Sequence, residues 1–269
     1  MRSFHVKGIH IGGHRPVLMG ILNLSPESFY SGSFVPFSSI EETAEQMVSQ
    51  GADILDIGAR STAPGSTPIS VAEECQRIEE CLSILEGSGY CISVDTMHPE
   101  VLKTALQYDI SLVNDISGLL HPEMGSLVAD SDLPAILMAT SKIPGDALTF
   151  NGTIENVSHV IRRAAAYDIT NIILDPAIGK WIPERNPQED WELCSRFSDL
   201  KEFDFPLLAA VSRKSFIGDL TGRSTDDRLA GTLAVTTSLI EKGADVVRAH
   251  DIPETLDVIN TVIHLQEFS

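Results

Sequence analysis

Eight short apolar runs recur along the chain, and each ends on polar residues before a helix-like stretch begins. The runs cover residues 17–23, 52–58, 92–96, 111–115, 135–140, 171–175, 207–214 and 245–250. Several are apolar at nearly every position, which is typical of parallel strands buried on both faces. The stretches between and after them predict helices over residues 39–50, 70–86, 99–107, 122–130, 153–168, 187–199, 225–242 and 254–266. Eight strand–helix units in succession predict an α/β fold with one (β/α)8 TIM-barrel domain over residues 1–269.

Two strand-to-helix connections, over residues 25–38 and 59–70, are long and rich in Ser, Gly and Pro. Long connections in a compact barrel are often lids over the active site. In TIM barrels the active site lies at the carboxyl ends of the strands. We therefore expect both connections to border a site built from the polar residues at the strand ends.

Composition and charge narrow the classes of function. The chain is 43% hydrophobic, which is enough for one barrel core, and its formal net charge is −19. Such a charge disfavours binding to nucleic acid or to anionic membranes. No apolar run reaches the about 18 residues of a membrane-spanning helix, and the first residues lack the apolar segment of a signal peptide. The four cysteines have no zinc-ligand spacing. These features predict a cytoplasmic protein with a small-molecule ligand.

Two of the apolar runs carry an aspartate at their carboxyl ends, Asp95 and Asp175, and another carries Asn114. A carboxylate at the end of a buried strand needs hydrogen-bond donors, because an isolated buried charge is unfavourable. A flat heterocycle with an N–C–N edge would supply paired donors, and an asparagine could read the same ring edge. The alternative is structural, since Asp and Asn at such positions also cap helices or turns.

The last two runs end on a serine and on basic residues, which are Ser212, Arg213, Lys214, Arg248 and His250. The ends of strands seven and eight often form a phosphate site in this fold. Arg248 and His250 point to the same face of their strand, because side chains alternate along a strand. With Asn23 at the end of the first strand, they would suit a diphosphate and a bridging Mg²⁺ ion. The alternative is a cluster of surface salt bridges.

Seven segments, in order along the chain, resemble those of the dihydropteroate synthases and of the wider pterin-binding barrel family. They are MGILNLSPESF (19–29), GADILDIGARSTAPG (51–65), SVDT (93–96), VNDISG (113–118), LDPAIG (174–179), SRKSFIG (212–218) and VVRAHD (246–251). The resemblance implies a transferase that condenses hydroxymethyl-dihydropterin diphosphate with p-aminobenzoate or a related arylamine and releases pyrophosphate. It places the protein in folate or methanopterin biosynthesis, and it implies a homodimer.

The resemblance also implies roles for individual residues. The pterin would be held by Asp95, Asn114, Asp175 and Lys214. The diphosphate would be held by Asn23, Arg248 and His250, with the cofactor Mg²⁺ at Asn23. The catalytic residues would be Lys214, Arg248 and His250, and the arylamine would lie near Ser212, Arg213, Arg60 and Thr62. In this chemistry the diphosphate leaves first, and the arylamine nitrogen then attacks the cationic methylene of the pterin.

Both long loops depart from the family pattern. Ser31 stands where the family usually has an acid, and Ala63 stands where it has an arginine, with Arg60 three residues earlier. These departures leave three alternatives open. The acceptor could be a larger arylamine, such as the ribofuranosyl-aminobenzene phosphate of methanopterin biosynthesis. The protein could instead be a methyltransferase of the same barrel family that uses methyl-tetrahydropterin and a corrinoid protein, or a non-catalytic pterin-binding paralogue.

Overall fold

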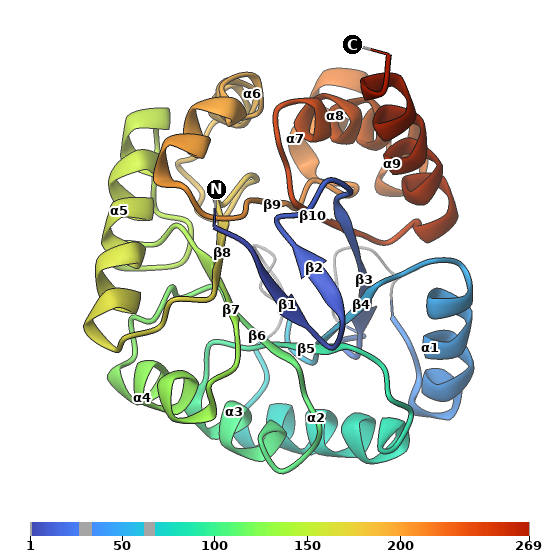
Figure 1. Ribbon diagram of the computed structural model, residues 1–269, viewed down its shortest axis with the longest axis vertical. Helices are drawn as coiled ribbons and strands as arrows, with labels where there is room; N and C mark the ends of the chain where they lie inside the picture. The colour runs from blue at the N-terminus through green and yellow to red at the C-terminus, as the bar shows by residue number, and fades with distance from the viewer. Residues whose placement is uncertain (1, 27–33, 62–67, 269) are drawn as a thin grey trace.

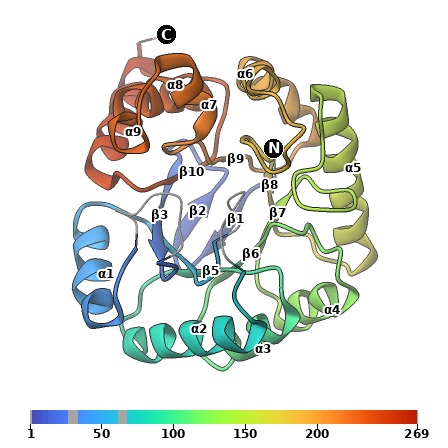
Figure 2. The ribbon, with the colours of Figure 1, turned by 180° about the vertical axis from the view of Figure 1, so that it is seen from behind.

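Eight parallel strands form a barrel with helices around it (Figures 1 and 2). The computed structural model describes residues 2–26, 34–61 and 68–268. The strands are β3 (Val17–Asn23), β4 (Ile54–Gly58), β5 (Ile92–Asp95), β6 (Leu112–Asp115), β7 (Ala135–Met138), β8 (Ile172–Asp175), β9 (Leu208–Ala209) and β10 (Val246–Ala249). They are hydrogen-bonded in the order β8-β7-β6-β5-β4-β3-β10-β9, and a parallel bridge between Leu174 and Leu207 joins the two ends. The predicted TIM barrel is confirmed.

The helices lie on the outside of the barrel (Figure 1). They are α1 (Ile40–Ser49), α2 (Val71–Leu85), α3 (Pro99–Ala105), α4 (Pro122–Ser131), α5 (Phe150–Ala166), α6 (Pro187–Ser195), α7 (Ser215–Thr221), α8 (Leu229–Glu241) and α9 (Ile252–Gln266). Short 3-10 segments are η2 (Phe37–Ser39), η3 (Phe197–Phe203) and η4 (Thr225–Asp227). Proline in the first turn of α3, α4, α6 and α9 suits the helix start, where its missing N–H has no partner to lose. Among the helices described, none is long and apolar enough to cross a membrane.

The core has two layers of apolar side chains. Successive strand residues such as Ile54 and Leu55 belong to different layers, because their side chains face opposite sides of the sheet. Leu55 packs toward the helices, whereas Ile54, Leu112 and Val246 fill the barrel near the amino ends of the strands. The apolar filling of the amino ends leaves the carboxyl ends for polar side chains.

An antiparallel hairpin of β1 (Phe4–Val6) and β2 (Ile9–Ile11) covers the amino ends of the strands (Figure 1). Val6 and Ile11 belong to the apolar layer inside the barrel. The hairpin goes beyond the predicted elements, although the alternating FHV and IHI segments around a Lys7-Gly8 turn are a signal for it. Both turn residues have positive φ, 43° at Lys7 and 81° at Gly8, as a tight hairpin turn requires.

The largest differences from the predicted elements lie around the seventh barrel strand. A strand was expected over 207–214, but only Leu208–Ala209 is assigned to β9. Arg213, four residues after the end of β9, has a φ of 56° in a turn, and the unpredicted helix α7 begins two residues later. The predicted helix 187–199 likewise ends as α6 at Ser195 and is followed by η3. Local backbone geometry, rather than hydrophobic pattern, sets these boundaries.

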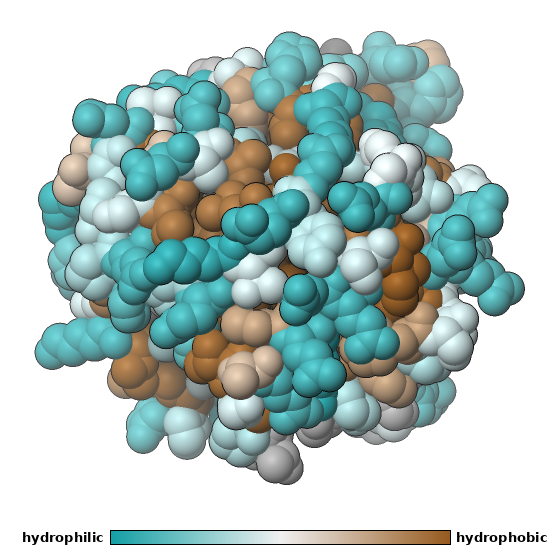
Figure 3. Space-filling model, turned by 90° about the horizontal axis from the view of Figure 1, so that it is seen from below, coloured by the Kyte–Doolittle hydropathy of each residue, from teal (hydrophilic) through white to brown (hydrophobic). Residues whose placement is uncertain are grey.

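One face of the molecule is shown in Figure 3. Hydrophobic residues (brown) form separate patches there between hydrophilic ones (teal). A mixed surface of this kind agrees with the formal net charge of −19 over the whole chain.

Candidate active site

A pocket of about 440 Å³ lies at the carboxyl ends of the strands. It brings together nine of the predicted site residues, which are Asn23, Arg60, Asp95, Asn114, Asp175, Ser212, Lys214, Arg248 and His250. Arg213 is not among the described residues that line it. Thr62 lies outside the described residues, as do Ser31 and Ala63 of the two long loops.

One side of the pocket carries buried acidic groups. Asp95 and Asn114 are register partners on β5 and β6, and Asn114 Nδ2 donates to Asp56 Oδ2 at 3.1 Å. Burial raises the pKa of Asp95 to about 7, with Arg248 opposing the shift and Asp56 reinforcing it. Burial also raises the pKa of Asp175. Carboxylates held in such a place gain from a ligand that brings N–H donors.

The capping alternative fails for two of these residues. The N-cap residue of α3 is His98 and that of α4 is His121, so neither Asp95 nor Asn114 caps the helix that follows it. Asp175 does take part in a turn, because its Oδ1 accepts a hydrogen bond from the backbone N–H of Ala177 at 2.8 Å. It lines the pocket as well.

Arg248 binds two acidic side chains beside the pocket, those of Asp56 and Asp95. Its Nε donates to Asp56 Oδ2 at 2.5 Å and its Nη2 donates to Asp95 Oδ2 at 2.8 Å. Burial lowers the pKa of Arg248, but Asp56 and Asp95 more than compensate, so its pKa is raised overall. The guanidinium therefore stays charged and balances carboxylates from β4 and β5. It remains at the pocket surface, where a ligand can compete for the same carboxylates.

Lys214 lies beside Asp175 and an aromatic wall. Its Nζ donates to the backbone carbonyl of Ile178 and lies 5.3 Å from the centroid of the Trp181 ring. Burial lowers the pKa of Lys214, while the charge of Asp175 raises it. Trp181 also lines the pocket, so a planar ligand has an aromatic surface next to a cation and a carboxylate.

Ser212 and His250 form a hydrogen-bonded pair between the end of the seventh strand and β10. Ser212 Oγ lies 2.8 Å from His250 Nδ1, and the backbone N–H of His250 donates to Ser212 Oγ at 3.2 Å. Burial, together with the charges of Arg248, Arg213 and Lys214, lowers the pKa of His250 to about 3. The imidazole is therefore neutral at neutral pH and acts as a hydrogen-bonding group, not as a cation.

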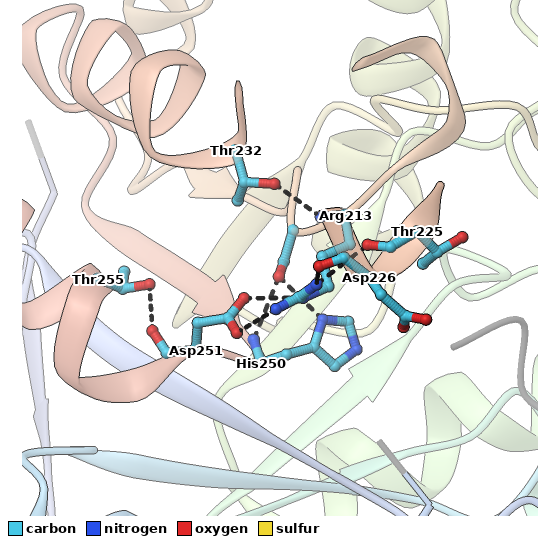
Figure 4. A network of polar contacts seen from close by, with 8 residues as sticks. Arg213, Thr225, Asp226, Thr232, His250, Asp251 and Thr255 are labelled. Atoms are coloured by element: carbon cyan, nitrogen blue, oxygen red, sulfur yellow. Dashed lines mark hydrogen bonds and ion pairs between the residues drawn. The ribbon is translucent and has the colours of Figure 1, made fainter. Parts of the chain in front are cut away.

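Arg213 is held by a network of polar contacts of its own (Figure 4). Its Nε and Nη2 bind the two Asp251 oxygens at 3.0 and 2.6 Å. Its Nη1 donates to the backbone carbonyls of Thr225 and Asp226 at 3.0 and 2.7 Å. These bonds tie the end of the seventh strand to the segment before α8 and to the start of α9. The predicted contact of Arg213 with an arylamine stays a prediction.

Known proteins are similar in sequence to this chain along nearly its whole length. The family model described as pterin binding enzyme matches residues 19–250. The chain belongs to this family. It is 34% identical over 254 residues to the type-3 dihydropteroate synthase of Escherichia coli, which covers 90% of this chain and 96% of that protein. It is 32% identical over 267 residues to the dihydropteroate synthase of Escherichia coli K12, covering 95% and 94%.

Solved structures of the family agree with the fold of this pterin-binding enzyme. The dihydropteroate synthase of Yersinia pestis, determined with a sulfonamide drug complex, has a TM-score of 0.90 and 29% identity, with both chains covered completely. That of Coxiella burnetii, in complex with pteroic acid, has a TM-score of 0.88 and 28% identity, again over 100% of both chains. The resemblance predicted from the seven segments is confirmed.

The pocket of this pterin-binding enzyme is locally positive within an acidic protein. Its described lining contains five Lys or Arg side chains, from Arg60, Lys180, Lys214, Arg228 and Arg248, but only two Asp side chains. The formal net charge of the whole chain is −19. The basic side chains of the lining therefore favour an anionic ligand in the pocket, although the chain as a whole is negative.

Several lining residues go beyond the predicted site. Ser215 begins α7, and Thr225 and Arg228 come from the segment before α8. Arg228 Nη1 donates to the backbone carbonyl of Arg213 at 2.9 Å, which is a contact that no sequence spacing signals. Asp56, an acid inside an otherwise apolar strand, does not line the pocket, but it accepts hydrogen bonds from Asn114 and Arg248, which do.

The chain offers one oxygen group for a magnesium ion at the predicted place. Asn23 lines the pocket, and its Oδ1 accepts a hydrogen bond from the backbone N–H of Ser25 at 3.0 Å. An amide oxygen has a second lone pair, and Mg²⁺ often takes only one or two protein ligands beside substrate phosphates and water. Among the described residues there is no group of three or more His, Cys, Asp or Glu side chains that could hold a metal by itself. Asn23 therefore fits a metal that arrives with a diphosphate.

Proposed function

We propose that this pterin-binding enzyme is a dihydropteroate synthase, which condenses hydroxymethyl-dihydropterin diphosphate with p-aminobenzoate and releases pyrophosphate. The observation that carries the proposal is one pocket that joins half-buried Asp95 and buried Asp175 to Lys214, Arg248 and His250. Acidic groups serve the N–H edge of a pterin, and cationic groups serve its diphosphate. The dihydropteroate synthases of Escherichia coli, similar over most of this chain, support the same assignment.

Pterin binding begins at the buried acids. Asp175 and Asp95 accept hydrogen bonds from the N–H groups of the ring, and Asn114 offers both a donor and an acceptor to its edge. Lys214 lies between Asp175 and Trp181, and it holds the ring from the opposite side. Because the ring brings its own donors to Asp95, the ion pair between Asp95 and Arg248 becomes replaceable, and Arg248 becomes available to the diphosphate.

Bond cleavage and bond formation then follow at the methylene carbon. The C–O bond to the diphosphate breaks with its electron pair on the departing oxygen, which Arg248 stabilises by its charge and the neutral His250 by hydrogen bonding. The lone pair of the arylamine nitrogen forms the new C–N bond, and one N–H proton is released to water or to the pyrophosphate. Mg²⁺ at Asn23 would neutralise part of the diphosphate charge when it is bound.

The test is the release of pyrophosphate from hydroxymethyl-dihydropterin diphosphate with Mg²⁺, with and without p-aminobenzoate. Release that depends on p-aminobenzoate supports the proposal. Release that depends only on a larger arylamine, such as ribofuranosyl-aminobenzene phosphate, would show that the acceptor is that arylamine and that the reaction type is the same. Tight binding of the pterin diphosphate without turnover for any arylamine refutes the proposal and favours a binding protein.

We also propose that Mg²⁺ is the cofactor and that the protein is a homodimer. Removal of Mg²⁺ by a chelator should abolish pyrophosphate release, and Asn23→Ala should raise the Mg²⁺ concentration needed. A contact between two copies could bury large apolar side chains that are exposed in one copy, such as Leu220 of α7, Leu265 of α9 and Phe268. Light scattering at micromolar concentration tests the dimer. The cytoplasmic location stays a prediction.

A further inference from the structure

A buried glutamate holds Arg60 at the wall of the pocket. Glu74 lies in the first turn of α2 and is only 1% exposed. Its Oε2 accepts a hydrogen bond from Arg60 Nε at 2.6 Å, and its Oε1 accepts one from Thr96 Oγ1 at 2.7 Å. Arg60 follows β4 and Thr96 follows β5, so the carboxylate of Glu74 connects the ends of two neighbouring strands.

This ion pair leaves part of Arg60 to a ligand. Its side chain is 13% exposed, and it lines the pocket. The guanidinium has five N–H donors in a fixed plane, of which the contact with Glu74 uses the one at Nε. In the described part of the chain, no residue accepts a hydrogen bond from Nη1 or Nη2 of Arg60. As far as the described residues are concerned, the two terminal nitrogens can therefore bind a ligand in the pocket.

The chemistry of such a fork favours an oxyanion. Two parallel N–H groups of a guanidinium match two oxygens of a carboxylate or a phosphate, and the bonds are strengthened by charge. Glu74 fixes the orientation of the fork, because both of its own oxygens are held. Without this support a long arginine side chain would lose several rotamers on binding, and its affinity for the ligand would fall.

We propose that Arg60, positioned by Glu74, binds an anionic group of a substrate in this pocket. The group is an oxyanion, either the diphosphate of the pterin substrate or the acid group of the arylamine, and this assignment rests on the proposed function. Glu74 is a positioning residue that acts only through Arg60.

The test compares Arg60→Met with Arg162→Met, which removes an exposed arginine from α5 on the outside of the barrel. Calorimetry measures the binding of two ligand pairs that differ in charge. The first pair is hydroxymethyl-dihydropterin diphosphate and the pterin alcohol without diphosphate. The second pair, measured with pyrophosphate and Mg²⁺ present, is p-aminobenzoate and 4-methylaniline. Thermal unfolding of each variant is recorded first.

We expect Arg60→Met to weaken one charged ligand by about tenfold to a hundredfold and to leave its uncharged partner unchanged. A loss of affinity for the charged ligand of the first pair identifies the diphosphate as the partner of Arg60. A loss of affinity for the charged ligand of the second pair identifies the carboxylate. Equal losses for charged and uncharged ligands, or affinities like those of Arg162→Met, overturn the inference. If the unaltered protein itself binds no pterin diphosphate, the proposed function has failed instead.

Two conservative variants separate binding from structural support. Arg60→Lys keeps the charge beside Glu74 but loses the fork, so it should restore part of the affinity. It also serves as the probe if Arg60→Met does not fold. Glu74→Gln keeps a hydrogen-bond acceptor for Thr96 but removes the ion pair, so it should raise KM for the same charged substrate with little change in kcat. An equal fall of kcat for every substrate would show that Glu74 supports the fold only.

Discussion

The buried carboxylate of Asp175 offers the sharpest test of the pterin pocket. Asp175→Asn keeps the size of the side chain and an oxygen for the backbone N–H of Ala177, which Asp175 binds at 2.8 Å. It removes the negative charge that faces Lys214 and the ring edge. The fold should tolerate the change, because burial already disfavours the charged form and raises the pKa of Asp175.

The expected size of the effect follows from the burial of the site. Asp175 is 6% exposed, so its hydrogen bonds to a ligand are poorly screened by water. A hydrogen bond to a charged group contributes about 1.5–3 kcal/mol. Since about 1.4 kcal/mol corresponds to a factor of ten, the Kd for the pterin diphosphate should rise about tenfold to a hundredfold.

Isothermal calorimetry measures this Kd directly, without turnover. Asp130→Asn, at an exposed position of α4, is the matched control and should bind like the unaltered protein. The unfolding midpoint of Asp175→Asn should be unchanged or higher. If the Kd of Asp175→Asn stays within about twofold of the control, the ring does not sit on this carboxylate and the assignment of the pocket is wrong.

Three further results are expected. The pKa of Asp95 is raised to about 7, above the about 3.9 of an unfolded chain, so the ionised form and the affinity for pterin should decline as pH falls below about 7. The same shift means that the contribution of Asp95 to stability is lost as pH rises through about 7. Asp95→Asn should flatten both the affinity profile and the stability profile. Arg213→Met leaves Asp251 without its ion-pair partner, and urea denaturation should show a loss of about 3–5 kcal/mol, whereas a stability like that of Arg162→Met would contradict the network in Figure 4. Ile11→Ala in the hairpin, where Ile11 is fully buried, should lower the free energy of unfolding by about 2–5 kcal/mol and leave the kcat of pyrophosphate release unchanged.

The barrel could be predicted because its signal is repeated and nearly continuous. Parallel strands such as β7 and β8 are buried on both faces, so their apolar runs stand out between amphipathic stretches. The boundaries around β9 could not be predicted in the same way. There the apolar run continues past the end of β9 at Ala209 into a turn with a positive φ at Arg213, and hydrophobicity encodes neither feature.

Part of the candidate site could likewise be predicted from the sequence, and part of it could not. Residues at strand ends, such as Asp95 and Lys214, were found because the fold itself brings such ends together. The partners of those residues were not found. Glu74 and Arg228 reach the pocket region from a helix and from a connecting segment, and only packing in three dimensions shows which side chain they hold. The ion pair of Arg213 with Asp251 likewise appears only in the folded structure.

The hairpin at the amino end of the barrel has a consequence for the order of events. It closes one end of the barrel with Val6 and Ile11, so ligands reach the acidic groups from the carboxyl end. The groups for the heterocycle lie on the strands, whereas Arg60, Lys180 and Arg228 come from the segments beyond them. Two substrates that enter the pocket through the same opening are not expected to bind equally well in either order. On the proposed function, we expect the heterocycle to bind before its partner and the joined product to leave through the same opening.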